Sequence, residues 1–160
     1  MSKANDIFFL RRSIEVSQNA RKNGNTPFGA ILVDADGQIV LEQENIEVTQ
    51  NDSTGHAETA LIRNASKRFT KDYLATCTLY TSCEPCAMCS GAVFWSNIRR
   101  VVYAMSEKRL LEITGSNDQD SSLDLPCREV FARGPKPIEV IGPFKEIEIE
   151  AAVAHNGFWD

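Results

Sequence analysis

The apolar positions of the chain switch between a helical period and a strand-like period. Residues 5–23 carry apolar residues at helical spacing between a polar capping residue and Gly24, and this pattern predicts the first helix. Two short apolar runs, 30–33 and 38–41, flank a turn that contains Asp and Gly, and they predict a β-hairpin. The chain is therefore expected to begin with one helix followed by a hairpin.

Helices and strands then alternate to the end of the chain. Residues 42–55 are polar and predict a loop, while residues 105–137 predict a loop with one short helix. The remaining predicted elements are helices at 56–68, 85–96 and 144–154 and strands at 77–80, 100–104 and 138–141. This alternation predicts an α/β fold whose strand pairings are mostly parallel after the hairpin.

Length and composition favour one domain over residues 1–160, with residues 157–160 as a C-terminal tail. The chain has 160 residues, of which 42% are hydrophobic, and this suffices for a sizeable core. No run approaches the roughly 18 apolar residues that a membrane span needs, and the N-terminal stretch lacks the pattern of a signal peptide. We therefore expect no association with a membrane.

Charge and cysteine content bear on partners and on the cellular compartment. The net charge is −5 and the short basic clusters are separated in sequence, so no basic stripe typical of nucleic-acid binding is visible. The five cysteines are an odd number, three of them between Cys83 and Cys89, so no disulfide framework is indicated. These features favour a cytoplasmic protein that does not bind nucleic acid.

Two short motifs contain the candidate chemistry: His56-Ala57-Glu58 and Pro85-Cys86-Ala87-Met88-Cys89. One histidine and two cysteines supply three zinc ligands and leave a fourth coordination position for water, as in a catalytic zinc site. We expect His56, Cys86 and Cys89 to bind one zinc ion per chain, and Glu58 to be the catalytic residue that moves protons.

The predicted helices explain why these residue types are useful at this spacing. Cys86 and Cys89 are three residues apart at the start of a helix, so their side chains share one face, and the helix dipole favours the thiolate form there. His56 and Glu58 lie at the start of another helix, where one side chain can bind metal while the other reaches the water. Zinc lowers the pKa of such a water to about 7, so that it attacks an electron-poor ring carbon bearing an amino group.

The same residues also have other interpretations. A Cys-x-x-Cys pair occurs in structural zinc knuckles and in redox pairs, and the triple spacing that begins at Cys83 is compatible with an iron–sulfur site. A structural zinc site would need a fourth ligand. The candidates for it are Cys77, Cys83, Cys127 and His155. The occurrence of both motifs in this order, with Glu58 beside the histidine, favours the catalytic interpretation.

With these motifs the chain resembles the cytidine and deoxycytidylate deaminase superfamily, the zinc-dependent deaminases of nucleobases. The resemblance is closest in pattern to bacterial guanine deaminases, in the stretches 27–30, 51–58 and 81–89. It implies a three-layer cytidine-deaminase-like fold with a five-stranded mixed sheet and helices on both faces. It also implies zinc as the cofactor.

The resemblance further implies contacts with the substrate. If the resemblance holds, Asn45 should hydrogen-bond the base, and Phe28 and His56 should flank its ring. The backbone of Ala57 should fix the edge of the base. The tRNA adenosine deaminases are similar in the metal motif but usually have Val where Phe28 stands.

Two further residues are weaker candidates for substrate contact. Asp118 lies in a polar loop where it would meet an exocyclic amino group, although a solvated acidic loop is the commoner explanation. Trp95, on the second predicted zinc helix, belongs either to the core or to the pocket wall. The chain departs from the guanine deaminase pattern at Ser53 and Gly55, where Pro and Ala are usual, and this leaves the identity of the base open.

Two large aromatic residues, Phe158 and Trp159, stand next to the C-terminus. They follow Gly157, which can end the last helix in a left-handed conformation. Because such side chains are costly to leave in water, we expect them to pack, either in a core groove or over the zinc pocket of the same chain or of a dimer partner. Related guanine and cytosine deaminases close their sites with C-terminal residues, so the resemblance favours Trp159 over the pocket.

The sequence therefore predicts hydrolytic deamination of a small-molecule free nucleobase, with guanine as the first candidate. Cytosine or another small aminated heterocycle and adenosine in tRNA are the alternatives among enzymes. A zinc-stabilised binding module without turnover is the alternative of another class. The second predicted zinc helix is apolar on more than one face, and with the resemblance to dimeric deaminases this predicts a homodimer.

Overall fold

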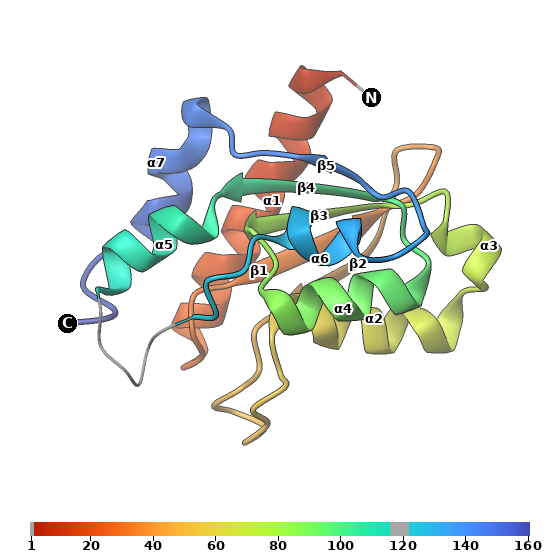
Figure 1. Ribbon diagram of the computed structural model, residues 1–160. Helices are drawn as coiled ribbons and strands as arrows, with labels where there is room; N and C mark the ends of the chain where they lie inside the picture. Colours follow the sequence, from red (N-terminus) through yellow and green to blue (C-terminus); the bar gives the residue numbers. More distant parts are fainter. Residues whose placement is uncertain (1, 116–121) are drawn as a thin grey trace.

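The computed structural model describes residues 2–115 and 122–160 (Figure 1). Its elements are α1 (Lys3–Lys22), β1 (Gly29–Val33), β2 (Ile39–Glu44), α2 (Ala57–Arg68), α3 (Lys71–Leu74), β3 (Thr78–Cys83), α4 (Ala87–Ser96), β4 (Arg100–Met105), α5 (Glu107–Thr114), α6 (Cys127–Ala132), β5 (Glu139–Ile141) and α7 (Lys145–Val153). The strands form one sheet in the order β2-β1-β3-β4-β5. β1 is antiparallel to both β2 and β3, whereas β3, β4 and β5 run parallel to one another.

Helices cover both faces of the sheet. In Figure 1, α1, α5 and α7 lie on one side, and α2, α4 and α6 lie on the other. Successive residues of β1 enter the two cores in turn: Ile31 and Val33 belong to the core with α1 and α7, and Ala30 and Leu32 to the core with α2 and α4. The predicted three-layer α/β fold with a five-stranded mixed sheet is therefore confirmed.

The start of β1 lies directly against α1. A Cβ atom on Gly29 would stand 2.5 Å from the carbonyl oxygen of Ser13 and 2.5 Å from the backbone nitrogen of Ser17, so this approach requires glycine. The Gly29 N–H donates to the Ser82 hydroxyl on β3 at 3.1 Å. This packing fixes the backbone beside Phe28, one of the predicted substrate contacts.

Two strands extend beyond the predicted ranges. β2 continues to Glu44, into the stretch predicted as a loop, because its ladder with β1 reaches the pair Gly29 and Glu44. β3 spans Thr78–Cys83 instead of 77–80, since Thr81 and Ser82 are polar yet buried and so interrupt the apolar pattern. Hydrogen bonding in the sheet decides both ends, and the pattern of the chain does not show it.

The prediction of one short helix in residues 105–137 was wrong, because this stretch contains both α5 and α6. Glu84, which is 8% exposed, supplies the reason. Its carboxylate accepts the N–H of Glu107 at 3.1 Å and the N–H of Cys127 at 2.9 Å, so one buried side chain caps the first residues of both helices. No helix in the described part of the chain is long and apolar enough to cross a membrane.

Candidate active site

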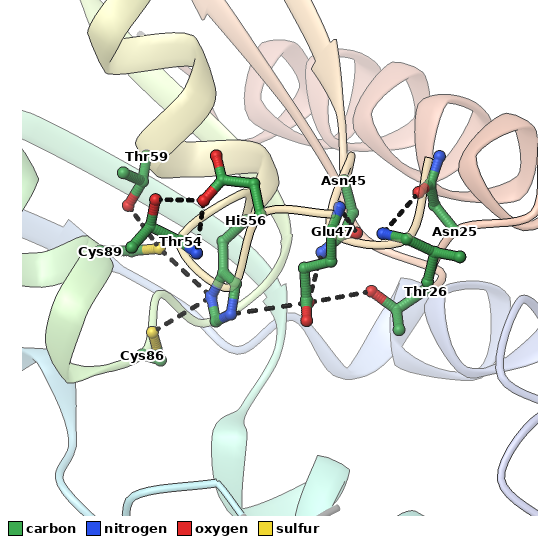
Figure 2. Close-up of polar contacts among 11 residues, drawn as sticks. Asn25, Thr26, Asn45, Glu47, Thr54, His56, Thr59, Cys86 and Cys89 are labelled. Atoms are coloured by element: carbon green, nitrogen blue, oxygen red, sulfur yellow. Dashed lines mark hydrogen bonds and ion pairs between the residues drawn. The ribbon is translucent and has the colours of Figure 1, made fainter. Parts of the chain in front are cut away.

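Two helix N-termini meet where β3 ends, and they hold the three predicted zinc ligands. His56 is the N-cap residue of α2 and Cys86 is the N-cap residue of α4, and neither side chain caps its own helix. Cys89 follows three residues later, in the first turn of α4. The three side chains are therefore free to point toward one another (Figure 2).

The distances among these side chains fit a tetrahedral zinc ion. His56 Nδ1 lies 3.5 Å from Cys86 Sγ and 3.6 Å from Cys89 Sγ, and the three ligand atoms lie within 4.8 Å of one another. Zinc bonds of about 2.3 Å to sulfur and about 2.0 Å to nitrogen, at tetrahedral angles, hold nitrogen and sulfur about 3.5 Å apart. The group therefore suits zinc, with Nδ1 as the histidine ligand.

Hydrogen bonds within the group favour the thiolate at Cys86 and the protonated thiol at Cys89, whose pKa is raised well above its usual value by the hydrogen bond with Cys86 and by burial. Cys89 donates to Cys86, and together with the neighbouring His56 this lowers the pKa of Cys86 to about 4. The Thr59 hydroxyl lies 3.1 Å from Cys89 Sγ (Figure 2). Because the thiolate is the form of cysteine that binds zinc, this environment prepares Cys86 as a zinc ligand.

Glu58 lies in the first turn of α2 and is 6% exposed. Its burial raises its pKa to about 7, and the negative charge of nearby Cys86 adds to the effect. A carboxyl group whose pKa lies near neutrality can both take up and release a proton at neutral pH. Glu58 is therefore suited to moving protons in the site.

A cavity of about 260 Å³ lies next to these residues. Phe28 and Trp159 are its aromatic residues, with ring centroids 6.3 Å apart. Trp159 of the C-terminal tail thus lines the pocket of its own chain, one of the placements that the sequence left open. The described residues that line the cavity are Thr26, Phe28, Glu47, His56, Glu58, Cys83, Glu84, Cys86, Glu107, Leu110, Thr114, Ser122 and Trp159.

The tail is held at the pocket by contacts with two other elements. The Trp159 indole N–H donates to His155 Nδ1 at 3.0 Å, and the Phe28 ring meets the His155 ring edge-on at 5.2 Å. Arg21, from α1, donates to the carbonyls of Ala154 and Asn156 at 2.9 and 2.6 Å. These contacts fix the turn that leads into the tail.

Two predicted substrate contacts lie behind the pocket wall. Ala57 is fully buried as the first residue of α2. Asn45 is also fully buried, and both ends of its amide bond Glu47: its Nδ2 donates to Glu47 Oε1 at 2.9 Å and its Oδ1 accepts from the Glu47 N–H at 2.9 Å. Their contact with the base stays a prediction.

Trp95 lies neither in the core nor in the pocket wall, which corrects both predictions for it. Its side chain is 71% exposed and meets the Phe94 ring edge-on at 5.3 Å. Residues two apart on a helix point in different directions. Val93 faces the core of the protein, and Trp95, two residues later on α4, therefore faces away from it. The other weak candidate, Asp118, lies outside the described residues.

The four candidates for a further zinc ligand do not join the metal group. Among the described residues, the cluster with ligand atoms close enough to share an ion consists of His56, Cys86 and Cys89. Cys83 lines the cavity but is not part of this cluster, and burial raises the pKa of its thiol well above the usual value. The geometry thus favours three protein ligands over a closed four-ligand site.

Three glutamates of the pocket were missed by the sequence analysis. Glu47 follows Asn45 by two residues, Glu84 precedes Pro85, and Glu107 begins α5. Glu84 lies directly before the cysteine motif, within the stretch 81–89 that resembles guanine deaminases, and this position was the one signal in the sequence. Glu47 and Glu107 lie in a loop and in a stretch without clear periodicity, so only the fold brings them to the cavity.

The α/β fold and this three-ligand site define the class of the protein as a zinc-dependent hydrolase. Comparisons with known proteins agree. The family model of the cytidine and deoxycytidylate deaminase zinc-binding region matches residues 3–105. The chain belongs to this family and is a zinc-dependent aminohydrolase acting on a nucleobase or nucleoside.

Individual relatives span much of the chain. The "Probable cytosine deaminase" of Schizosaccharomyces pombe is 44% identical over 155 residues, which cover 97% of this chain and 93% of that protein. The guanine deaminase of Bacillus subtilis is 44% identical over 124 residues, covering 76% of this chain and 78% of that protein. A solved structure of guanine deaminase from Bacillus subtilis matches with a TM-score of 0.63 and 32% identity, covering 97% and 95% of the two chains.

Proposed function

We propose that this enzyme removes the amino group of a free nucleobase by hydrolysis, with guanine as the first candidate and xanthine and ammonia as its products. The observation that supports a free base is the small cavity beside His56, Cys86 and Glu58, which Trp159 of the same chain helps to enclose. At about 260 Å³, it lies below the roughly 300–1,000 Å³ typical of sites for drug-sized ligands. A flat base fits this space better than a base that carries ribose.

The site residues have distinct tasks in this reaction. Overall, the oxygen of water bonds to the ring carbon, the C–N bond breaks, and the amino group departs as ammonia. His56, Cys86 and Cys89 would hold the zinc ion, which would lower the pKa of a bound water and so supply an activated water. Glu58 accepts a proton of the water and delivers it to the adjacent ring nitrogen. It then accepts the remaining proton of the new hydroxyl group on the ring carbon and delivers it to the leaving amino group. Its pKa near 7 suits transfer in both directions.

The pocket walls suit a flat and uncharged ring. Phe28 and Trp159 offer aromatic surfaces against which a base can stack, and His56 flanks the ring on the metal side. The described lining contains four glutamates and neither lysine nor arginine. Because carboxylates repel phosphate, this lining disfavours nucleotides and the backbone of tRNA.

Cytosine is the second candidate substrate. The Schizosaccharomyces pombe relative, whose name specifies cytosine, matches 97% of this chain, a larger share than the 76% matched by the guanine deaminase relative. Cytosine is smaller than guanine and also offers an aminated ring carbon, so the same chemistry applies.

The compartment that we infer for this enzyme is the reducing cytoplasm, because none of the five cysteines forms a disulfide.

Ammonia release tests this proposal. Purified zinc-loaded protein would be supplied with bases, their nucleosides and nucleotides, and aminated triazines, and ammonia would be measured for each. We expect guanine to have the highest kcat/KM, and every nucleoside to fall below its own base. Highest activity with cytosine would select the second candidate, and preference for a nucleoside or a nucleotide would contradict the free-base proposal.

A further inference from the structure

Glu47 lies beside the metal group but has no assigned role in the chemistry. It belongs to the loop between β2 and α2, lines the cavity, and has a side chain that is 32% exposed. Figure 2 shows its carboxylate between His56 on one side and Thr26 on the other. A carboxylate at this place is a hydrogen-bond acceptor at the edge of the substrate space.

One oxygen of Glu47 is held by three groups. Its Oε1 accepts from Asn45 Nδ2 at 2.9 Å and from the Thr26 hydroxyl at 3.4 Å, and it lies 3.6 Å from His56 Nε2 (Figure 2). Because His56 offers Nδ1 to zinc, its Nε2 carries the proton and faces Glu47. All three neighbours present N–H or O–H groups, so Oε1 is fixed as an acceptor.

The backbone of Glu47 is fixed as well. Its N–H donates to Asn45 Oδ1 at 2.9 Å, and its carbonyl accepts from the Asp52 N–H at 3.0 Å. The loop closes on Gly55, where a Cβ atom would stand 2.9 Å from the Asp52 carbonyl oxygen. The glycine at this position therefore permits the tight loop that holds Glu47.

The second oxygen of Glu47 is available to a ligand. Within residues 2–115 and 122–160, no hydrogen bond to Oε2 is found, although Oε1 takes two. The side chain lines the cavity and is already ordered by its other contacts, so little conformational entropy remains to be lost when a substrate binds. An ordered acceptor with a free lone pair discriminates strongly between a donor and a non-donor.

We propose that Glu47 determines specificity by accepting, through Oε2, one N–H of the substrate ring or of an exocyclic amino group. This inference rests on the proposed deamination of a free base and names the feature that such a base must carry. The base must present an N–H donor at the edge beside His56. Asn45, which is buried behind Glu47, acts as a positioning residue that holds this carboxylate.

The proposal separates classes of substrate. A base with a ring N–H or amino group at this edge gains a charge-assisted hydrogen bond. A base with a lone pair there is repelled, and a base whose nitrogen carries methyl or ribose has no proton to donate. Free aminated bases rich in N–H groups are therefore preferred over N-substituted ones for an electrostatic reason as well as for size.

The variant Glu47→Gln tests the proposal by reversing the polarity of one atom. Asn45 and Thr26 both donate to Oε1, so the amide oxygen of glutamine takes that place and its NH₂ points into the cavity. Guanine and cytosine would each be compared with analogues in which one ring N–H at a time is replaced by N–CH₃. We expect wild type to discriminate against one methylated analogue of the preferred base by roughly 10- to 100-fold in kcat/KM.

In Glu47→Gln, kcat/KM for the preferred base should fall by roughly 10- to 100-fold and this discrimination should shrink toward onefold. Zinc content should stay at the wild-type level. A purely steric effect of the methyl group would persist in the variant, so unchanged discrimination would overturn the role of Glu47 while leaving the proposed function intact. Equal loss on all substrates, or loss of zinc, would also overturn it, because Glu47 would then act through His56.

Glu44→Gln is the matched control. Glu44 lies three residues earlier, accepts from Asn23 and does not line the cavity. This variant should keep the wild-type kcat/KM and discrimination, and a shift equal to that of Glu47→Gln would contradict a local role for Glu47. Failure of the wild-type enzyme to deaminate any free base would instead contradict the proposed function, and the inference would fall with it.

Discussion

Four glutamates line the pocket, and their neighbours make them chemically different. Glu58 is buried near the ionised Cys86, and its pKa rises to about 7. Glu107 is 4% exposed, accepts a hydrogen bond from Ser122, and also has its pKa raised to about 7 by burial. Glu84 is occupied by two backbone N–H groups, and Glu47 is held by Asn45. At the scale of single residues, burial gives Glu58 and Glu107 a pKa at which a carboxyl group can exchange protons near neutral pH, whereas hydrogen bonds hold Glu84 and Glu47 in place.

Replacing Cys86 by alanine should abolish zinc binding. The change removes one of three ligands, and two remaining ligands do not hold zinc tightly. Metal analysis of the purified variant should find well below one zinc per chain, against about one in wild type. Cys83→Ala is the matched control, because Cys83 lines the same cavity outside the metal group, and it should keep its zinc. Zinc loss in the control alone would contradict the ligand assignment.

Replacing Glu58 by glutamine should stop turnover without loss of metal. The amide keeps the size of the side chain but cannot carry the proton, and general acid–base catalysis typically contributes about 100- to 10,000-fold. Steady-state ammonia release should therefore fall at least about 100-fold, with zinc content and substrate binding near wild type. Activity within tenfold of wild type would exclude Glu58 as the proton carrier.

At the scale of elements, the site is assembled where helix N-termini and the C-terminal tail converge. His56 and Cys86 are N-cap residues of α2 and α4, so the positive ends of two helix dipoles face the thiolates. Trp159 reaches the same place from the turn after α7, and Arg21 of α1 anchors that turn. Gly157 in this turn has φ +69°, the left-handed conformation that its sequence position indicated.

Deleting residues 157–160 should weaken activity on the free base while folding and zinc binding persist. Trp159 lines the cavity, whereas Phe158 packs under the Arg21 guanidinium at 5.5 Å. Trp159→Ala should therefore raise KM or lower kcat by about two- to tenfold, as expected for loss of an aromatic stacking partner. The neighbouring variant Phe158→Ala should change stability more than KM. A truncated protein with full activity but a much lower Tm would show that the tail only packs.

The stability contributed by the hydrogen bond between Trp159 of the tail and His155 should depend on pH, because His155 titrates. Burial, with Arg21 nearby, lowers the pKa of His155 to about 4 from an ordinary value of 6.5, and its Nδ1 must stay unprotonated to accept from Trp159. Because the folded state has the lower pKa, this stabilisation is complete above about pH 6.5 and is lost as pH falls toward 4. The loss reaches at most about 3 kcal/mol.

His155→Asn isolates this effect, since asparagine can present an oxygen near the Nδ1 position without titrating. Urea unfolding would be followed for wild type and variant between pH 8 and pH 4. The free energy of unfolding of wild type should fall relative to that of the variant as pH decreases through this range. A difference between the two proteins that stays constant with pH would contradict the assignment to His155.

At the scale of the whole molecule, α4 joins the metal site to the surface. Cys89, Ser90, Val93 and Ser96 of this helix are buried, while Trp95 is 71% exposed and Met88 is 37% exposed. A large apolar side chain left in solvent next to a catalytic helix suits an interface with a second subunit. The homodimer predicted from the sequence remains a prediction, and it now has a defined surface.

Trp95→Asp should convert the dimer into a monomer. A charge in the centre of an apolar interface is unpaired and costly to desolvate. Light scattering or sedimentation at micromolar concentration should give twice the chain mass for wild type and a single chain mass for the variant. Ile149→Asp, at a 79% exposed apolar residue of α7, is the control and should stay dimeric. A wild-type monomer under these conditions would contradict the prediction.

The sequence by itself determined the metal group and most of the elements. His56, Glu58, Cys86 and Cys89 belong to local motifs at helix starts, where short-range geometry and the helix dipole favour metal binding within each motif. The fold then brings the two motifs together. The helical and strand-like periods likewise follow from local burial, which is why α1, α2, α7 and the hairpin appear near their expected positions.

Only the tertiary structure decided which side chains share the pocket. Glu47 is a pocket residue because hydrogen bonds from Asn45 and Thr26, together with the tight loop to Gly55, hold it there. Glu84 caps the starts of α5 and α6 by accepting N–H groups 23 and 43 residues away. Trp95 and Trp159 are both aromatic residues, yet one faces solvent and the other lines the cavity. Hydrogen bonds and packing between distant segments make these choices, and local hydrophobic patterning contains no information about them.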